Sequence, residues 1–435
     1  VKSQRTCGTM DYLNQQKVQN PAIVSQMEQI ERFTQTYTSQ SSNRTSSVIT
    51  IPVVFHIVYN TSAQNISDAQ CIAQLNQLNL DYARLNADRT NTPSAFSTIA
   101  ASTNIQFCLA VRDPNGNPTT GIVRKSTTKS SFTTNDGVKS SSQGGDDPWP
   151  SGSYLNIWSC NLSNGILGYA QFPGGSSTTD GVVLLYSSIG SFTTPGTASP
   201  YNLGRTATHE VGHWLNLYHI WGDDSGSCTG TDNCSDTPNQ AGENYGCPTY
   251  PKTDACATSS PGVMFMNYMD YTDDGCMNMF TTGQSTRMNA LFATGGARAS
   301  LLNSQGCVPV SSSSCGNPTN LVSTTTTTSA NLSWTAVTGA ISYNLQYKLG
   351  TSTTYTTING ITLTSYSLSN LTSNSLYNWQ VQAVCSTANS AYVPSTFTTL
   401  SPNSCVDTYE SNNTSSTAKT ISLNTDIRAL ISTST

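Results

Sequence analysis

Charged side chains are scarce in this chain: they make up 10% of its 435 residues, and the net charge is −5. Lysine and arginine form no cluster, so the sequence offers no electrostatic surface for nucleic acid or anionic lipid. Long apolar runs are absent as well. The longest, VITIPVVF at 48–55 and GVVLLY at 181–186, have the length of β-strands and are too short to span a membrane. We therefore expect no nucleic-acid partner and no membrane span.

The chain begins with VKSQRTCG, without a Met or a hydrophobic signal, so we expect any export signal to have been removed. Thirteen cysteines, with abundant Ser, Thr and Asn, predict a secreted protein whose thiols are mostly paired. Because the number is odd, one thiol must be free, bound to something, or paired outside this chain.

Four blocks follow one another along the sequence. Residues 1–46 are polar, contain one amphipathic helical stretch at 20–33, and are typical of a pro-segment. Residues 47–308 mix strands, as at 48–59 and 154–162, with helices at 67–85 and 282–293, and predict an α+β domain. A Ser67/Gln70 capping box is expected to open the first of these helices.

Residues 316–400 predict an all-β unit with regularly spaced strands at 330–337, 342–349 and 377–385. Trp334 on an early strand, and Leu371 six residues before Tyr377, resemble a fibronectin type III sandwich with its tyrosine corner. Residues 401–435 resemble the start of a further β-rich domain, of the kind that follows secreted bacterial peptidases, so we expect the chain to be part of a longer bacterial precursor.

Histidine is rare, yet three of the four histidines lie within eleven residues, HEVGHWLNLYH at 209–219. On a helix, His209 and His213 are four apart and can bind one metal ion. Neutral imidazoles suit Zn²⁺, and a catalytic zinc site takes three protein ligands and one water. Glu210 lies beside the first ligand and can act as a general base without binding the metal.

His219 lies on the wrong side of a continuous helix, because six residues beyond His213 is roughly 240° of rotation. It can serve as the third ligand only if the helix ends near Asn216 and the chain turns back. Asn tolerates the left-handed conformation that such a turn needs. The alternative is an amphipathic helix whose histidines face solvent or fill polar gaps.

HEVGHWLNLYH resembles the extended zinc signature of the metzincin metallopeptidases. With HIWGDD at 219–224 and FMNYMDYTDDGCMNMFT at 265–281, residues 47–300 are similar to the pappalysin family of that clan. The signature has Gly where this chain has Asn216. By resemblance, Met269 forms the Met-turn beneath the ligands and Tyr271 donates its hydroxyl to an oxyanion. Without the resemblance, Met269 reads as core and Tyr271 as a turn aromatic.

The resemblance also implies several finer features. Asp274 would select Lys or Arg after the scissile bond, although Asp-Asp-Gly also reads as a simple turn. Asp232, Asp236 and Thr237 would bind calcium, unless the acidic stretch at 222–238 is only a solvated loop. The family pairs Cys247 with Cys276, and Cys256 with either Cys228 or Cys234; spacing alone does not establish these bonds.

Cys7 is a candidate latency switch, because a thiolate could take the water position on zinc. Its alternative is an ordinary disulfide. Arg5 could hold the pro-segment by pairing with a carboxylate of the cleft. An enzyme that prefers Arg after the scissile bond would cut its own tether between Asn43 and Arg44.

Together these features predict a monomeric zinc endopeptidase that is made as a zymogen and acts on proteins or peptides. An adhesive or matrix-binding protein with a structural zinc site is the alternative, motivated by the sandwich and the Ser/Thr-rich surface. Glu210, Met269 and Tyr271 argue against it, because a structural site needs no base and no open coordination position.

Overall fold

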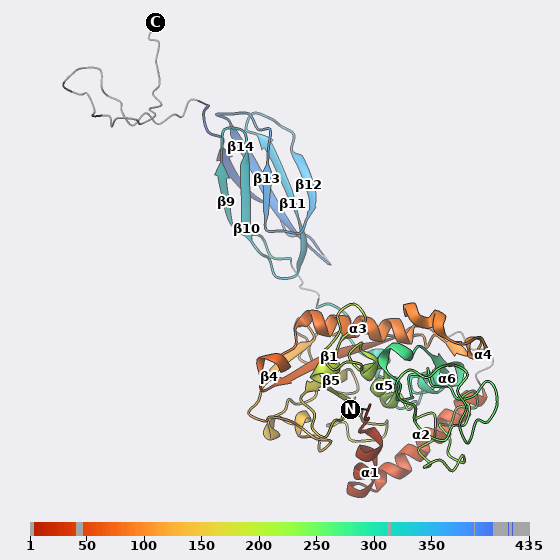
Figure 1. Ribbon diagram of the computed structural model, residues 1–435. Helices are drawn as coiled ribbons and strands as arrows, with labels where there is room; N and C mark the ends of the chain where they lie inside the picture. The colour runs from red at the N-terminus through yellow and green to blue at the C-terminus, as the bar shows by residue number, and fades with distance from the viewer. Residues whose placement is uncertain are drawn as a thin grey trace. The chain divides into compact units, whose positions relative to one another are not determined.

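The computed structural model describes residues 4–40, 47–310, 315–386 and 388–402, together with residues 416 and 420. The chain divides into two compact units, Val1–Val310 and Ser311–Thr435 (Figure 1). The β-rich start expected at 401–435 lies almost entirely outside the described residues. No helix in the described part of the chain is long and apolar enough to cross a membrane.

A six-stranded sheet forms the centre of the first unit. Its order is β3-β1-β5-β7-β6, and β4 pairs with the second half of β1. Every pairing is parallel except that of β6 with β7, so β6 is an antiparallel edge strand. The strands are β1 (Ile49–Tyr59), β3 (Ile105–Leu109), β4 (Ile122–Ser126), β5 (Leu155–Cys160), β6 (Gly168–Ala170) and β7 (Val182–Leu185). β2 (Ala100–Ala101) and β8 (Phe280–Thr281) form a separate pair.

Both faces of this sheet are covered, which explains why β1 reads as a nearly continuous apolar run. Val53 and Phe55 belong to the large core beneath α3 and α5. Val54 and Val58 belong to two smaller clusters on the other face. The helices are α1 (Thr9–Gln19), α2 (Ala22–Ser39), α3 (Asp68–Tyr82), α4 (Ser94–Ser97), α5 (Arg205–Trp214) and α6 (Thr282–Ala290). The 3-10 turns of this unit are Ser62–Gln64, Ala87–Asn91, Gly137–Lys139, Ser141–Gln143, Tyr186–Ser188, Asp274–Cys276 and Ala299–Asn303.

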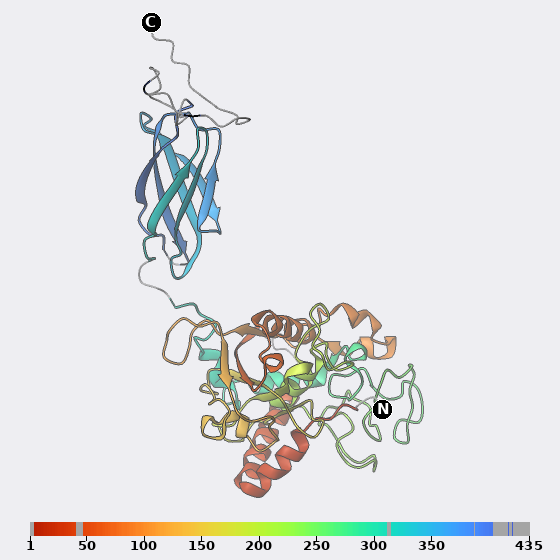
Figure 2. The same ribbon diagram turned by 60° about the vertical axis from the view of Figure 1, so that its left-hand side comes forward.

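The described part of residues 1–46 contains two helices, where the sequence analysis expected one. They are α1 and α2, which lie together on the side of the unit away from α3 (Figures 1 and 2). The expected capping box of α3 is also wrong. Ser67 accepts a hydrogen bond from the Gln70 amide, but the Gln70 side chain donates to the Ile189 carbonyl. A complete box caps α6 instead, between Thr281 and Gln284.

Residues 215–279 contain no α-helix or β-strand, although the structure describes all of them. Figure 2 shows this segment as a set of green loops. The disulfides Cys228–Cys256 and Cys247–Cys276 cross-link it, and Cys108–Cys307 closes the unit near its end. Among the described cysteines, Cys7, Cys71, Cys160 and Cys234 are free thiols.

The second unit is a two-sheet β-sandwich. One sheet has the order β13-β10-β9 and the other β12-β11-β14-β15. Trp334 and Trp379 lie in its core, and the Tyr377 hydroxyl accepts a hydrogen bond from the Thr372 amide, as in a tyrosine corner. The strands are β9 (Thr319–Thr325), β10 (Ala330–Thr335), β11 (Ala340–Leu349), β12 (Thr356–Ile361), β13 (Ser365–Leu368), β14 (Leu376–Cys385) and β15 (Val393–Thr398). A Cys315–Cys385 disulfide closes it.

Candidate active site and metal centre

Helix α5 carries His209, Glu210 and His213, and all three are buried. The helix is fixed at its first residue, because the buried Arg205 guanidinium pairs with Asp81 and Asp88. The spacing of four residues brings the two imidazoles onto one face, with their Nε2 atoms 3.1 Å apart.

The third imidazole reaches the same point because the helix stops. α5 ends at Trp214, and Asn216 has a φ of 70°, the left-handed conformation that the position of His219 requires. His219 Nε2 then lies 3.2 Å from His213 Nε2. The turn is held from outside by Arg287, whose guanidinium donates twice to the Asn216 carbonyl.

The three imidazoles fit a metal ion by their hydrogen bonds. Their Nδ1 atoms face the Tyr268 carbonyl at 2.7 Å, the Leu217 carbonyl at 2.7 Å and the Asp223 carboxylate at 2.8 Å. Because each of these partners accepts, each Nδ1 carries the proton and each Nε2 presents a lone pair. Three lone pairs so close together repel unless a cation lies between them. Tetrahedral zinc at about 2.05 Å from each nitrogen would place them about 3.3 Å apart, close to the observed spacing.

Cys7 from the N-terminal segment completes the cluster. Its half-buried Sγ lies 3.5 Å from His213 Nε2 and 3.5 Å from Glu210 Oε2. The four potential ligand atoms lie within 4.8 Å of one another, the single such group of His, Cys, Asp and Glu in the described residues. Burial and the nearby Glu210 carboxylate raise the pKa of the Cys7 thiol, an effect that a bound cation would oppose.

Glu210 points into the same space and is confined there by small neighbours. A Cβ on Gly168 of β6 would lie 2.8 Å from Glu210 Cγ, so the close approach of strand and helix requires glycine. The Thr9 hydroxyl donates to Glu210 Oε2 at 2.8 Å. Burial raises the pKa of Glu210 to about 7.

Met269 and Tyr271 lie on the loop beneath and beside the imidazoles. Met269 is fully buried, and a Cβ on Gly212 of α5 would lie only 2.5 Å from its sulfur. The Tyr271 ring packs against the rings of His209 and His219. Burial, reinforced by Cys7 and Glu210, raises the pKa of Tyr271, so its hydroxyl is a proton donor.

Asp274 is fully buried and forms the second contact with the N-terminal segment, an ion pair. Its Oδ1 pairs with the Arg5 guanidinium, and its Oδ2 accepts from the Leu203 amide at 2.8 Å. Arg5 is buried too and stacks over the Tyr201 ring. Arg5 thus lies in a buried ion pair with Asp274, two residues along the chain from Cys7 of the metal cluster.

The three residues considered for calcium lie in the acidic loop, but their side chains do not all contact one another. The Thr237 hydroxyl lies 2.8 and 2.9 Å from the two carboxylate oxygens of Asp232 and shares its one proton between them. Asp236 points elsewhere, because its carboxylate accepts from Gly283 at the start of α6. Burial raises the pKa of Asp232 to about 6.

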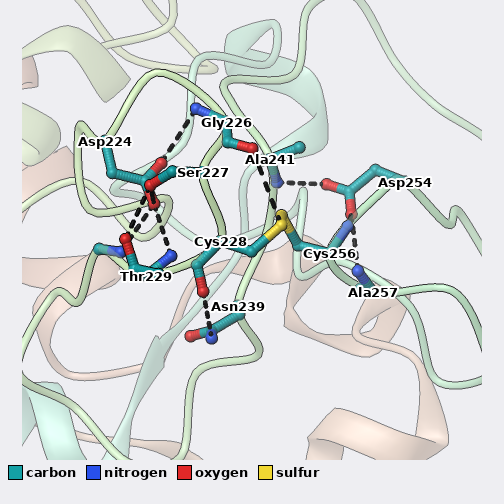
Figure 3. The surroundings of a disulfide bond; sticks show 11 residues. Asp224, Gly226, Ser227, Cys228, Thr229, Asn239, Ala241, Asp254, Cys256 and Ala257 are labelled. Atoms are coloured by element: carbon teal, nitrogen blue, oxygen red, sulfur yellow. Dashed lines mark hydrogen bonds between the residues drawn. A yellow bond between two sulfur atoms is a disulfide. The ribbon is translucent and has the colours of Figure 1, made fainter.

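Cys228 bonds to Cys256, one of the two partners that the family resemblance allowed, and Cys234 stays free. Figure 3 shows that Asp224 and Asp254 stabilise the two sides of this disulfide by accepting backbone N–H groups. Cys247 bonds to Cys276 two residues after Asp274. Asn43 and Arg44, the expected activation site, lie outside the described residues.

Sequence reasoning missed Asp223, which orients His219, and Thr9, which reaches Glu210. The spacing of four residues from His219 to Asp223 could have indicated the first. No local pattern indicates the second, because 201 residues separate its two partners.

Two family models match the chain. The peptidase M43 model, described as pregnancy-associated plasma protein-A, matches residues 139–293, and a fibronectin type III model matches residues 316–398. An extracellular metalloprotease of Arthroderma otae is 33% identical over 295 residues, which cover 66% of this chain and 90% of that protein. One from Podospora anserina is 44% identical over 148 residues, 32% of this chain and 47% of that protein.

Solved structures are similar as well. Mature mirolysin of Tannerella forsythia in complex with a cleaved peptide is 59% identical, with a TM-score of 0.58, over 59% of this chain and 97% of that chain. A mutant of promirolysin from the same organism is 53% identical, with a TM-score of 0.64, over 69% of this chain and 97% of that chain.

Proposed function

The chain belongs to the pappalysin family of metallopeptidases, and from this premise we propose that it is an extracellular zinc endopeptidase made as a zymogen. The observation that carries the proposal is the convergence of Cys7 with His209, His213 and His219, while Arg5 fills the pocket of Asp274. One segment thus blocks both the metal centre and an adjacent side-chain pocket.

The three imidazoles would hold the zinc, and the Cys7 thiol faces the same point. Zinc bound there would act as a Lewis acid, lowering the pKa of water to about 7 and polarising a carbonyl group. Glu210 would accept the proton of the attacking water and pass it to the leaving amine. Tyr271 would donate its hydroxyl proton in a hydrogen bond to the oxyanion.

The Asp274 pocket supports a preference for Lys or Arg just after the scissile bond. Arg5 already shows that a guanidinium fits there, with its charge neutralised by a buried carboxylate and its face covered by Tyr201. A neutral side chain would leave the buried Asp274 carboxylate without its cationic partner, which is costly.

Latency would come from residues 1–46. Cys7 lies against the imidazole cluster that would hold the metal, the Thr9 hydroxyl donates a hydrogen bond to Glu210, and Arg5 pairs with Asp274. The promirolysin match covers 69% of the chain and the mature match 59%. The difference, ten per cent of 435 residues, is close to the length of the proposed pro-segment. A cut between Asn43 and Arg44 would release it.

Secondary features complete the proposal. Asp232 and Thr237 would bind a structural calcium ion, while Asp236 caps α6. The protein would be monomeric and secreted by a bacterium, with the sandwich as a spacer or weak adhesion module.

The test is a digest of denatured proteins by the activated enzyme, with and without a zinc chelator, in which mass spectrometry reads every new N-terminus. We expect chelator-sensitive fragments that begin with Lys or Arg, and a self-cut before Arg44. Asp274→Asn should lose the preference, while the neighbouring Asp273→Asn should keep it. Chelator-sensitive cuts without that preference would discard the role of Asp274. No cuts at all, with residues 1–46 removed, would favour the matrix-binding alternative.

A further inference from the structure

Tyr12 of the pro-segment occupies a closed aromatic pocket. The residue is buried, and its ring centroid lies 4.9 Å from that of Tyr169. The Lys139 ammonium lies over both rings, 4.8 Å from the Tyr12 centroid and 4.9 Å from the Tyr169 centroid. Trp158 completes the box around the cation, 5.6 Å away. Such an arrangement combines apolar burial with cation–π attraction.

The pocket also recognises the phenol group. The Tyr12 hydroxyl donates to Asp136 Oδ2 at 2.7 Å and accepts from Lys139 Nζ at 3.3 Å. Both polar residues have other partners: Lys139 pairs with Asp136 at 2.8 Å and donates to the Thr179 carbonyl at 2.7 Å. Lys139 and Asp136 therefore keep partners when Tyr12 leaves, which favours a pocket that retains its polar groups.

This pocket lies on the edge strand that borders the metal centre. Tyr169 is the middle residue of β6, next to Gly168, which contacts Glu210. The pro-segment pairs with this edge, since Gly8 donates to the Gly168 carbonyl at 2.8 Å and the Leu167 amide donates to the Thr6 carbonyl at 2.9 Å. An extended peptide paired with β6 would place alternate side chains on the Tyr169 face of the sheet.

The order of the pro-segment fixes the side of the cleft. Arg5 precedes Cys7 and enters the Asp274 pocket, whereas Tyr12 follows Cys7 and lies beyond the metal cluster. If the Asp274 pocket takes the residue after the scissile bond, the Tyr12 pocket lies on the side of the residues before it.

We propose that removal of residues 1–46 turns the Tyr12 pocket into a substrate subsite for a tyrosine side chain on the N-terminal side of the scissile bond. This inference rests on the proposed peptidase function and adds a second determinant of its specificity. Phenylalanine would fill the aromatic box but would not bond to Asp136 and Lys139. Because those two residues satisfy each other, the loss of the hydroxyl should lower the rate moderately, by about tenfold or less.

The experiment uses the activated enzyme and peptides with Arg just after the cleavage point. Tyr, Phe or Ala is placed at each of the four positions before it, and kcat/KM is measured for every peptide. At one position we expect Tyr to exceed Ala by at least about tenfold, with Phe between them. Lys139→Met and Asp136→Asn should each bring the Tyr/Phe ratio at that position close to one. Lys125→Met, on an exposed strand end, is the matched control and should keep the ratio.

The outcomes separate the two proposals. Cleavage of the whole series without a preference for Tyr at any position would overturn the subsite, and so would a Tyr/Phe ratio that survives in both pocket variants. These results would leave the peptidase proposal intact. Failure to cleave any peptide would overturn the proposed function and this inference with it. The comparison in the unaltered enzyme decides the question even if one variant fails to fold.

Discussion

The candidate active site is assembled from two regions that hold their residues by different means. Helix α5 supplies His209, Glu210 and His213 from a single turn of regular backbone. The segment 215–279 supplies His219, Tyr271 and Asp274 without any helix or strand longer than a 3-10 turn. In the first region, hydrogen bonds along the helix fix the relative positions. In the second, side chains and cross-links must do so.

The means used by the loop region are visible in its contacts. The buried Asp270 carboxylate accepts from the Asn244 amide at 2.7 Å and from Gln240, and it joins two distant parts of the loop. Burial raises the pKa of Asp270 to about 6. The Cys247–Cys276 disulfide ties the same parts together. The backbone hydrogen bonds of helix α5 place its residues without such cross-links. Substitutions in the two regions should therefore have different effects: those in α5 should remove catalytic activity, and those in the loop should lower its stability.

The largest effect is expected from Glu210→Ala in α5. Removal of the general base should lower kcat by about 10³-fold or more, whereas zinc content should not change because Glu210 is not a ligand. Metal analysis and peptide cleavage measure the two properties separately. Glu243→Ala, an exposed carboxylate of the loop, is the control and should stay active. Equal activity in the Glu210 variant would refute its role as the base.

The second effect belongs to the loop. Replacing Cys247 and Cys276 together by serine should lower the free energy of unfolding by about 3 to 4 kcal/mol, because the bond closes a loop of 29 residues. Urea unfolding measures this change, and the preference for Lys or Arg should weaken with it. Loss of Cys315–Cys385, in the sandwich, should leave cleavage unchanged. A loop variant with unaltered stability would show that buried side chains alone hold the segment.

The same contrast explains what the sequence could predict. The spacing within α5 is local, so His209 and His213 could be placed from the helical repeat alone, and the φ of Asn216 followed from the need to return His219. The sequence analysis expected Arg5 to pair with an unnamed carboxylate of the cleft. It did not identify Asp274 as that partner, because 269 residues separate the two.

Other features had no local signal at all. Helix α1 has little amphipathic pattern. Of its buried apolar side chains, Tyr12 packs on strands of the sheet that are distant in sequence, and Leu13 packs on Phe172 and on Ile23 of α2. The Cys108–Cys307 bond spans 199 residues and went unpredicted. The capping box was assigned to Ser67 because the pattern fits, but the Gln70 side chain donates its hydrogen bond to the Ile189 carbonyl, which is distant in sequence.

A third test measures how much the hydrogen bond from His219 to Asp223 contributes to zinc binding. Asp223→Ala removes the carboxylate that fixes the tautomer of His219. Loss of a hydrogen-bond partner of a metal-binding histidine typically lowers the metal affinity by about 10- to 100-fold. Competition with a chelator measures the zinc affinity. Asp224→Ala is the matched control, since its carboxylate accepts hydrogen bonds within its own turn (Figure 3). Equal affinities of the two variants would mean that packing, including the stacked Trp221 ring, orients His219.

The smallest effect is expected where the two regions join, at Asn216. Asn216→Gly should change the zinc affinity by less than about threefold. Asn already tolerates a positive φ, and Gly loses more conformational entropy on folding. Asn216→Ala should weaken binding by about fivefold, since Ala tolerates the left-handed conformation less well than Asn and adopting it costs about 1 kcal/mol. Chelator competition compares the three proteins. A large gain with Gly would show that Asn misplaces His219, whereas equal affinities for Gly and Ala would show that Arg287, which holds the Asn216 carbonyl, imposes the turn whatever side chain is present.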